Sequence, residues 1–245
     1  MVRGKGRPAP AKTGRGNKNL TRASSSTAGR GSSRKRPKGP MSVRDEILRH
    51  GGARGERWYE AVAKASEAFA EDRERDAIRI LRPVRQALPG APSVRELLGV
   101  SLYRAGQYKA AAEELDSYAE LTGEVNQHPV LMDCARALGQ PGRVRELWTE
   151  LAEVSPSSEL VTEGRIVLAG SLADNDRLDE AIAMLGRRAS GSVKRVQQHH
   201  LRLWYALADL EERSGNLARA RTLFDRIRSH EAGFADVAER LAALG

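Results

Sequence analysis

The side chains that could do chemistry are few, and their spacing does not assemble a metal or catalytic site. His199 and His200 are adjacent, and consecutive residues of a helix point about 100° apart, so the two rings do not form one ligand face. His50, His128 and His230 do not stand at ligand spacing either. The histidines therefore predict no metal and no cofactor.

Cys134 is the only cysteine, and we expect it at a buried helix position. A buried cysteine usually behaves as an inert small hydrophobe, and a single one fits a reducing compartment. Acidic pairs such as Glu113-Glu114 and Glu211-Glu212 are explained by charge on helix surfaces. The sequence contains no P-loop, nucleophile-elbow or HExxH motif. We therefore expect a protein that is not an enzyme.

The strongest electrostatic feature is a basic segment at residues 1–40. It holds twelve Lys or Arg and no Asp or Glu, while the rest of the chain has 29 basic and 32 acidic residues. Such a polycation neutralises phosphates and releases their counterions. It has no aromatic residue to stack on bases, so binding to RNA, ribosome or DNA would be insensitive to sequence. A solubilising extension is the alternative. The candidate polyanion-binding residues in the densest run are Arg34, Lys35, Arg36 and Lys38.

A second basic cluster accompanies an expected loop near residues 190–196. Loops that interrupt compact arrays are often functional, and an anion site there is one interpretation; a solvated loop is the other. Together with the basic segment, this cluster supports an alternative function, in which the chain is itself a nucleic-acid-binding protein acting through residues 187–202. Its members are Arg187, Arg188, Lys194, Arg195 and Arg202.

Residues 1–40 are too poor in large apolar side chains to offset the entropy cost of ordering, so we predict a disordered tail. Ser42 and Asp45 have the spacing of a capping box that opens a short helix ending before Gly51. We predict four parts: a disordered basic tail at 1–40, an N-terminal capping helix and linker at 41–55, a repeat array at 56–231, and a C-terminal capping helix at 232–245.

The sequence of residues 56–231 repeats with a period typical of helical hairpins. Any functional side chains in this segment are therefore expected to lie on helices or on the turns between them. Anchor residues recur at spacings of 34, 36, 34 and 39, with a small residue twelve positions earlier, a turn residue five earlier and a large apolar residue four later. The small residues allow two helices to approach closely, and the large ones fill the space between hairpins. The longer spacings place insertions near 123–127 and 190–196. The anchors are Ala77, Ala111, Leu147, Ala181 and Ala220; the turn residues are Asp72, Gly106, Gly142, Asp176 and Gly215; the small residues are Ala65, Gly99, Ala135, Ala169 and Ala208; the large ones are Leu81, Leu115, Leu151, Leu185 and Phe224.

This pattern resembles the tetratricopeptide repeat over about residues 56–231. The second unit matches best, through Leu98, Gly99, Leu102, Gly106, Tyr108, Ala111 and Leu115, and Trp204 and Pro89 fall where the family often has its tryptophan and proline. The third unit departs most, with Leu147 in place of a small anchor and Cys134 in place of a leucine, and the first has Lys64-Ala65 in place of Leu-Gly. The resemblance implies an all-α, right-handed superhelical solenoid of about five helix-turn-helix repeats with short capping helices.

The resemblance also implies a function: a non-catalytic scaffold that binds a protein or peptide segment in a concave groove lined by the first helix of each hairpin. The side chains that this template places on or near the groove are Glu96, Tyr103, Arg104, Arg136, Tyr205, Asp209 and Arg213.

The compartment follows from what the sequence lacks. Residues 1–30 contain no apolar run typical of a signal peptide, and no stretch is long and apolar enough to span a membrane. We expect a cytoplasmic protein of unknown oligomeric state. The 33 Arg against 8 Lys suggest a bacterial genome of high GC content.

Overall fold

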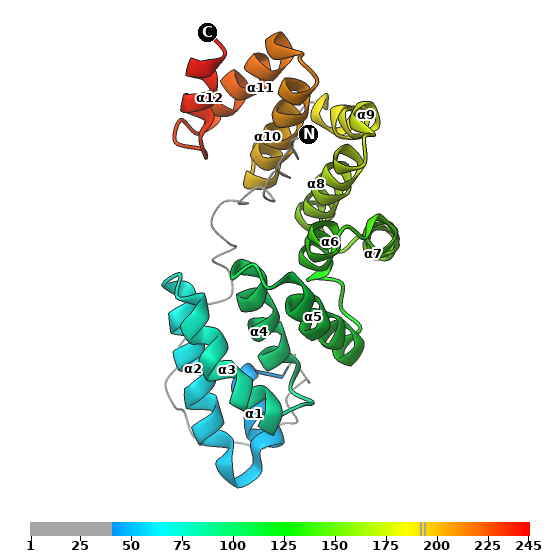
Figure 1. Ribbon diagram of the computed structural model, residues 1–245. Coiled ribbons are helices and arrows are strands. Elements are labelled where there is room, and N and C mark those ends of the chain that lie inside the picture. The colour runs from blue at the N-terminus through cyan, green and yellow to red at the C-terminus, as the bar shows by residue number, and fades with distance from the viewer. Residues whose placement is uncertain (1–40, 192, 194) are drawn as a thin grey trace, which may run out of the picture. The chain divides into compact units, whose positions relative to one another are not determined.

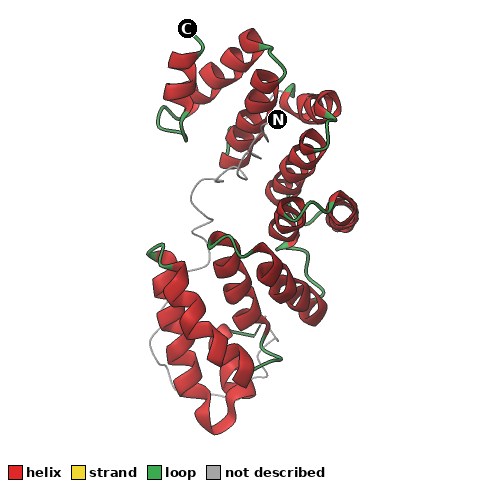
Figure 2. Cartoon of the chain, in the orientation of Figure 1, coloured by secondary structure: helices red, strands yellow, loops and turns green. Residues whose placement is uncertain are grey.

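The structure is a computed structural model that describes residues 41–191, 193 and 195–245. The basic segment 1–40, with the disorder predicted for it, lies outside these residues. Within them the chain forms helices joined by turns and loops, and no strand is present (Figure 2). The helices are α1 (Val43–Gly51), α2 (Gly55–Ala70), α3 (Glu74–Ala87), α4 (Pro92–Arg104), α5 (Tyr108–Thr122), α6 (His128–Ala137), α7 (Pro141–Val154), α8 (Ser158–Asp174), α9 (Leu178–Ala189), α10 (Gln198–Arg213), α11 (Leu217–His230) and α12 (Val237–Ala243), with a short 3₁₀ turn η2 (Gly52–Arg54).

Helices α2 to α11 pair in sequence order into five hairpins: α2–α3, α4–α5, α6–α7, α8–α9 and α10–α11 (Figure 1). Each second helix packs on the next first helix, and successive first helices also contact one another. One hairpin cannot bury its apolar face alone, so stacking supplies the core. The predicted all-α solenoid of helix-turn-helix repeats is confirmed. None of the helices described has the length and apolarity that a membrane crossing needs.

The same turn closes all five hairpins. One residue adopts positive φ in each: Asp72 (58°), Gly106 (74°), Gly139 (70°), Asp176 (60°) and Gly215 (85°). The amide of the following residue donates to a carbonyl five residues earlier, at N···O distances of 2.8–3.0 Å. A left-handed residue that ends a helix favours glycine, and aspartate is among the side chains that tolerate it. These five residues, called the turn residues below, set the register of the repeats.

The third hairpin corrects the predicted register. Gly142 was predicted as its turn residue and is not; it lies in the first turn of α7, directly after Pro141, and the turn is made by Gly139. The position equivalent to the other anchors is therefore Val144, three residues before Leu147. Both side chains are buried, at 0% and 1% exposure, so apolar pattern alone does not distinguish them.

Two further statements about the third unit change with this register. Met132 takes the place predicted for Ala135, seven residues before the turn residue. Leu131 stands at the position of Leu98 in the second hairpin, so Cys134 does not replace a leucine. The third unit keeps the leucine of the repeat but carries methionine where the second hairpin has glycine.

Close approach of helices is evident at Gly99 in α4. A Cβ at this position would lie 2.6 Å from the side chain of Leu115, which is fully buried in α5. The predicted anchors in the other four hairpins are alanines with 0% exposure, and Leu81, Leu185 and Phe224 fill the space one helical turn beyond them. The small and large registers of those hairpins are confirmed.

One of the two predicted insertions is confirmed. The connection between α9 and α10, residues 190–197, is the longest within the described array. The insertion predicted near 123–127 is not one, because it was derived from Leu147 as the anchor in place of Val144. The extra length lies in α8, which has 17 residues against 10 in α6.

Short helices flank the hairpins. The Ser42 side chain accepts from the Asp45 amide at 3.1 Å and caps α1 as predicted, although α1 continues through Gly51. After α11, α12 buries Val237 and Leu241 against it.

Candidate functional site

The candidate site is the face that successive first helices share. We define this first-helix face by the positions two, three, six and ten residues before each turn residue. All seven side chains predicted for a groove occupy these positions: Glu96, Tyr103, Arg104, Arg136, Tyr205, Asp209 and Arg213. Because α2, α4, α6, α8 and α10 contact one another in that order, side chains on this face can reach the neighbouring repeat.

A polar network joins three successive first helices. Tyr103 Oη on α4 donates to Asp133 Oδ2 on α6 at 2.6 Å. Arg136, one turn along α6, lies 3.7 Å from Asp133 Oδ1, and its Nε donates to Asp174 Oδ2 on α8 at 2.6 Å. The structure thus brings Tyr103 and Arg136 together through a shared aspartate.

Gly170 makes room for this network. A Cβ there would come within 2.6 Å of the Arg136 guanidinium, which therefore rests on the backbone of α8. Burial opposes the charge of Arg136, but its hydrogen bond to Asp174 and the charge of Asp133 raise its pKa. The guanidinium stays charged and is fixed in position.

Arg104 and Glu96 lie in separate contacts on α4. Arg104 pairs with Asp72 in the preceding hairpin turn and with Glu74 Oε1 at 2.9 Å, and its guanidinium lies 4.5 Å from the ring centre of Phe69. Glu96 accepts from Gln127 Nε2 at 2.8 Å. Burial raises the pKa of Glu96.

Tyr205 and Asp209 contact the terminal helix region. Tyr205 Oη donates to Asp236 Oδ1 at 2.6 Å, and burial with this hydrogen bond raises the pKa of the phenol. Asp209 accepts from Arg240 Nη2 at 3.0 Å. These two predicted groove residues therefore hold the segment that follows α11. Arg213 is exposed near them.

The sequence reasoning missed the partners of these residues. Asp133 and Asp174 also occupy first-helix positions, six and two residues before their turn residues. A further bridge joins Arg202 Nη2 on α10 to Glu163 Oε2 on α8 at 2.6 Å. Arg202 and Glu163 stand thirteen residues before their own turn residues, and this equal register in neighbouring repeats is the signal that would have found the pair.

The predicted polyanion-binding residues fall partly within the described chain. Arg187 and Arg188 are exposed in the last turn of α9, Arg195 is exposed in the loop that follows, and Arg202 is paired with Glu163. The remaining candidates lie outside the described residues; they are Lys194, Arg34, Lys35, Arg36 and Lys38.

The other groups considered for chemistry have structural surroundings. Cys134 is fully buried, as predicted, and burial, together with the charges of Asp133 and Asp116, raises the pKa of its thiol to about 12. The rings of His199 and His200 lie 4.0 Å apart, and His200 Nδ1 accepts from the backbone amide of Gln197 at 3.1 Å. Among the described residues, no group of three or more potential ligands could hold a metal ion.

Comparisons with known proteins agree with this geometry. Family models described as tetratricopeptide repeat match residues 62–125 and 201–244. A thermophilic TPR protein from Thermus thermophilus is 16% identical, with a TM-score of 0.59 over 76% of this chain and 98% of its own. A putative kinesin light chain with TPR-like repeats from Podosopora anserina is 16% identical, with a TM-score of 0.56 over 72% of this chain and 95% of its own.

No curated protein matches the chain. The likeness to the two solved structures supports the fold, and the family matches fall on the first two hairpins and on the fifth with α12. With five hairpins closed by one recurring turn, the described part of the chain is an all-helical solenoid, and its residues 62–125 and 201–244 match the tetratricopeptide repeat.

Proposed function

We propose that this chain is a non-catalytic scaffold that binds an extended segment of a partner protein along the first-helix face. Arrays of this kind generally bind proteins on extended surfaces that their stacked repeats create. The observation that carries the proposal is the network of Tyr103, Asp133, Arg136 and Asp174, which fixes hydrogen-bonding groups from three successive repeats on one face.

Fixed polar groups favour recognition because a surface ordered before binding loses less conformational entropy when the partner arrives. The charges on this face are mixed: it carries the guanidinium groups of Arg104, Arg136 and Arg213 and the carboxylates of Glu96 and Asp174. We therefore expect a partner segment that carries charges of both signs, and not a uniformly acidic or basic one.

The polycationic segment 1–40 would add a nonspecific attraction to RNA, ribosome or DNA. This part of the proposal rests on charge alone: twelve Lys or Arg without a carboxylate, whose affinity for phosphates falls steeply with salt. If this attraction governed all binding, the alternative function, a nucleic-acid-binding protein acting through the segment and residues 187–202, would replace the scaffold.

Affinity capture separates the two functions. The full chain and a chain beginning at Met41 would each be used as bait, with and without nuclease. The scaffold predicts partner proteins that both baits retain and that resist nuclease. Loss of every partner after nuclease treatment, or with the shorter chain, would favour the nucleic-acid-binding function.

A further inference from the structure

Three arginines lie near the junction of the third and fourth hairpins: Arg145 and Arg188, which are exposed, and Arg165, which is partly buried. Arg104, Arg136, Arg202 and Arg240 all pair with carboxylates. Within the described residues, no ion pair joins a carboxylate to the three arginines of this junction, Arg145, Arg165 and Arg188.

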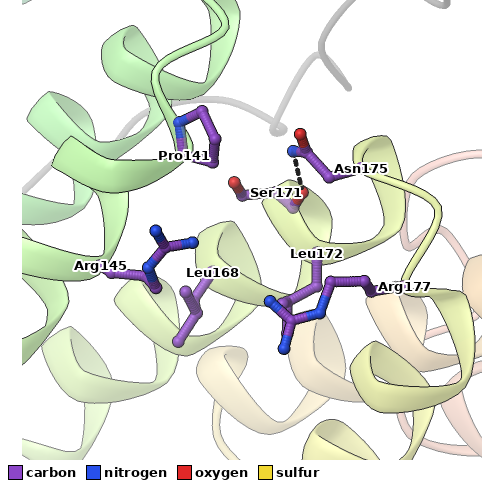
Figure 3. A pocket seen from close by; sticks show the side chains of 7 residues that line it. All are labelled: Pro141, Arg145, Leu168, Ser171, Leu172, Asn175 and Arg177. Carbon is purple, nitrogen blue, oxygen red and sulfur yellow. Dashed lines mark hydrogen bonds between the residues drawn. The ribbon is translucent and has the colours of Figure 1, made fainter.

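A cavity of about 190 Å³ lies beside Arg145, between α7 and the turn that joins α8 to α9. Arg145 reaches it from α7 and Arg177 from the turn, with Leu168 between them (Figure 3). Ser171 and Asn175 supply a hydroxyl and an amide to the wall, and no lining residue is acidic. Asn175 Nδ2 donates to the Ser171 carbonyl at 2.7 Å, which holds the amide in place.

The charge of Arg177 is partly balanced. Its Nε and Nη2 donate to the two carboxylate oxygens of Glu180, both at 2.7 Å. This pair uses one edge of the planar guanidinium, and the remaining N–H groups stay available because arginine has five donors. Arg145 is exposed and has no such counter-ion within the described part of the chain, so its positive charge faces the cavity without a paired carboxylate.

Arg165 stands on the same side of α8 as the cavity residues, and Arg188 on α9 lies close enough for its charge to act on Arg165. Arg165 lies two turns before Leu172, about 10 Å along the helix, with its guanidinium 5.3 Å from the ring centre of Trp148. Burial and then the nearby positive charge of Arg188 lower the pKa of Arg165. An anion near this group would offset its repulsion with Arg188.

This cavity is distinct from the first-helix face. On an α-helix, Leu168, Ser171, Leu172 and Asn175 point roughly 130° away from Gly170 and Asp174. A ligand in the cavity and a partner on the first-helix face would therefore contact different sides of α8.

We propose that the cavity between α7 and the α8–α9 turn binds an oxyanion, a phosphate or carboxylate group, which the guanidinium groups of Arg145 and Arg177 hold by their charge. The fixed amide of Asn175 and the Ser171 hydroxyl contribute to the polar wall, and charge-assisted hydrogen bonds from guanidinium groups are the strong contacts. The site is independent of the scaffold function, so the failure of either proposal leaves the other intact.

Thermal unfolding of the full chain, titrated with inorganic phosphate and separately with acetate at ionic strength matched by sodium chloride, tests this site. A ligand that binds only the folded state raises the unfolding temperature with concentration, which yields a dissociation constant. Two variants complete the series: Arg145→Gln, which removes the exposed cavity charge, and Arg82→Gln, which removes an exposed and equally unpaired charge from α3.

The proposal predicts that phosphate stabilises the parent and the Arg82→Gln variant alike, and that Arg145→Gln weakens phosphate binding at least about tenfold. A response to acetate as well would assign the site to carboxylates in addition, whereas a response to phosphate alone would assign it to phosphoryl groups. The proposal is wrong if neither anion stabilises the parent, or if Arg145→Gln responds as the parent does; because all three proteins carry residues 1–40, binding there cannot produce the difference.

Discussion

Glu114 shows at the scale of one residue how the array is held together. It is 8% exposed on α5, and its carboxylate oxygens pair with Arg85 Nε on α3 at 2.9 Å and with Arg95 Nη1 on α4 at 2.8 Å. Arg95 Nε also donates to the carbonyl of Pro89 at 2.9 Å. One carboxylate therefore fixes the first hairpin against the second.

Replacing Glu114 by alanine should lower the free energy of unfolding by about 3 kcal/mol, because the largely buried guanidinium of Arg95 would lose its counter-ion. Urea denaturation measures the change. The control is Glu113→Ala on the same helix, where the side chain is exposed and the expected effect is within about 0.5 kcal/mol. Equal effects for both substitutions would show that the ion pairs of Glu114 with Arg85 and Arg95 do not stabilise the array.

His199 makes stability depend on pH. Burial, and then the positive charge that His200 can carry, lower the pKa of His199, although Glu159 acts in the opposite direction. The folded state thus disfavours the protonated ring, and the unfolded state binds more protons as the pH falls through the usual histidine range near about 6.5. The contribution of His199 is present above this range and is lost below it.

The free energy of unfolding, measured by denaturation at about pH 7.5 and about pH 5.5, checks the direction of this pH dependence. His199→Gln should lose less stability on acidification than the parent does. His50→Gln, at an exposed position, should lose as much as the parent. A variant at position 199 that kept the full pH dependence would contradict the assignment.

At the scale of elements, the hairpin turn decides the register, and sequence pattern locates it in four of five cases. Asp72, Gly106, Asp176 and Gly215 were found correctly, because a single turn residue lies between two apolar patterns there. In the third hairpin Gly139 and Gly142 flank Pro141, and buried residues at both Val144 and Leu147 satisfied either register. Proline at the first helical position resolves the choice, because it starts a helix readily and places Gly142 inside it.

Alanine substitutions test this correction directly. Gly139→Ala should destabilise by about 1–2 kcal/mol, because its φ of 70° is costly for a residue with a Cβ. Gly142→Ala should be neutral or stabilising by up to about 1 kcal/mol, since a Cβ there meets nothing within 4 Å and alanine favours helix. The opposite order of the two stabilities would restore Gly142 as the turn residue.

The side chains of the first-helix face were predictable by position but not by partner. A repeat template places Tyr103 or Arg136 on that face because the position recurs in every unit. The bonds to Asp133 and Asp174 depend on how far one repeat is displaced against the next, and α6 and α8 differ in length by seven residues. That displacement is set by side-chain packing between neighbouring hairpins. The repeat period of the sequence does not reveal this packing.

At the scale of the whole molecule, each repeat contacts mainly its neighbours, so perturbations should stay local. Arg240 tests this at the C-terminal end: its guanidinium pairs with Asp209 and Glu212 on α10 and lies 5.2 Å from the ring centre of Phe224. Arg240→Ala should speed hydrogen exchange in α10 and α12 and leave α2 to α5 unchanged. Faster exchange throughout the chain would mean that the array unfolds as a single unit.

Site-specific photo-crosslinking tests most directly whether a partner protein binds along the first-helix face. A photoreactive residue would replace Ala137 and, separately, Arg213, which stand two residues before the turn residues of α6 and α10. The controls are the exposed positions Arg82 on α3 and Glu153 on α7, both on second helices. If the partner binds along the first-helix face, we expect crosslinks to the same partner protein from positions 137 and 213 and none from positions 82 and 153. Crosslinks from the second-helix positions alone, or equally from all four, would contradict it.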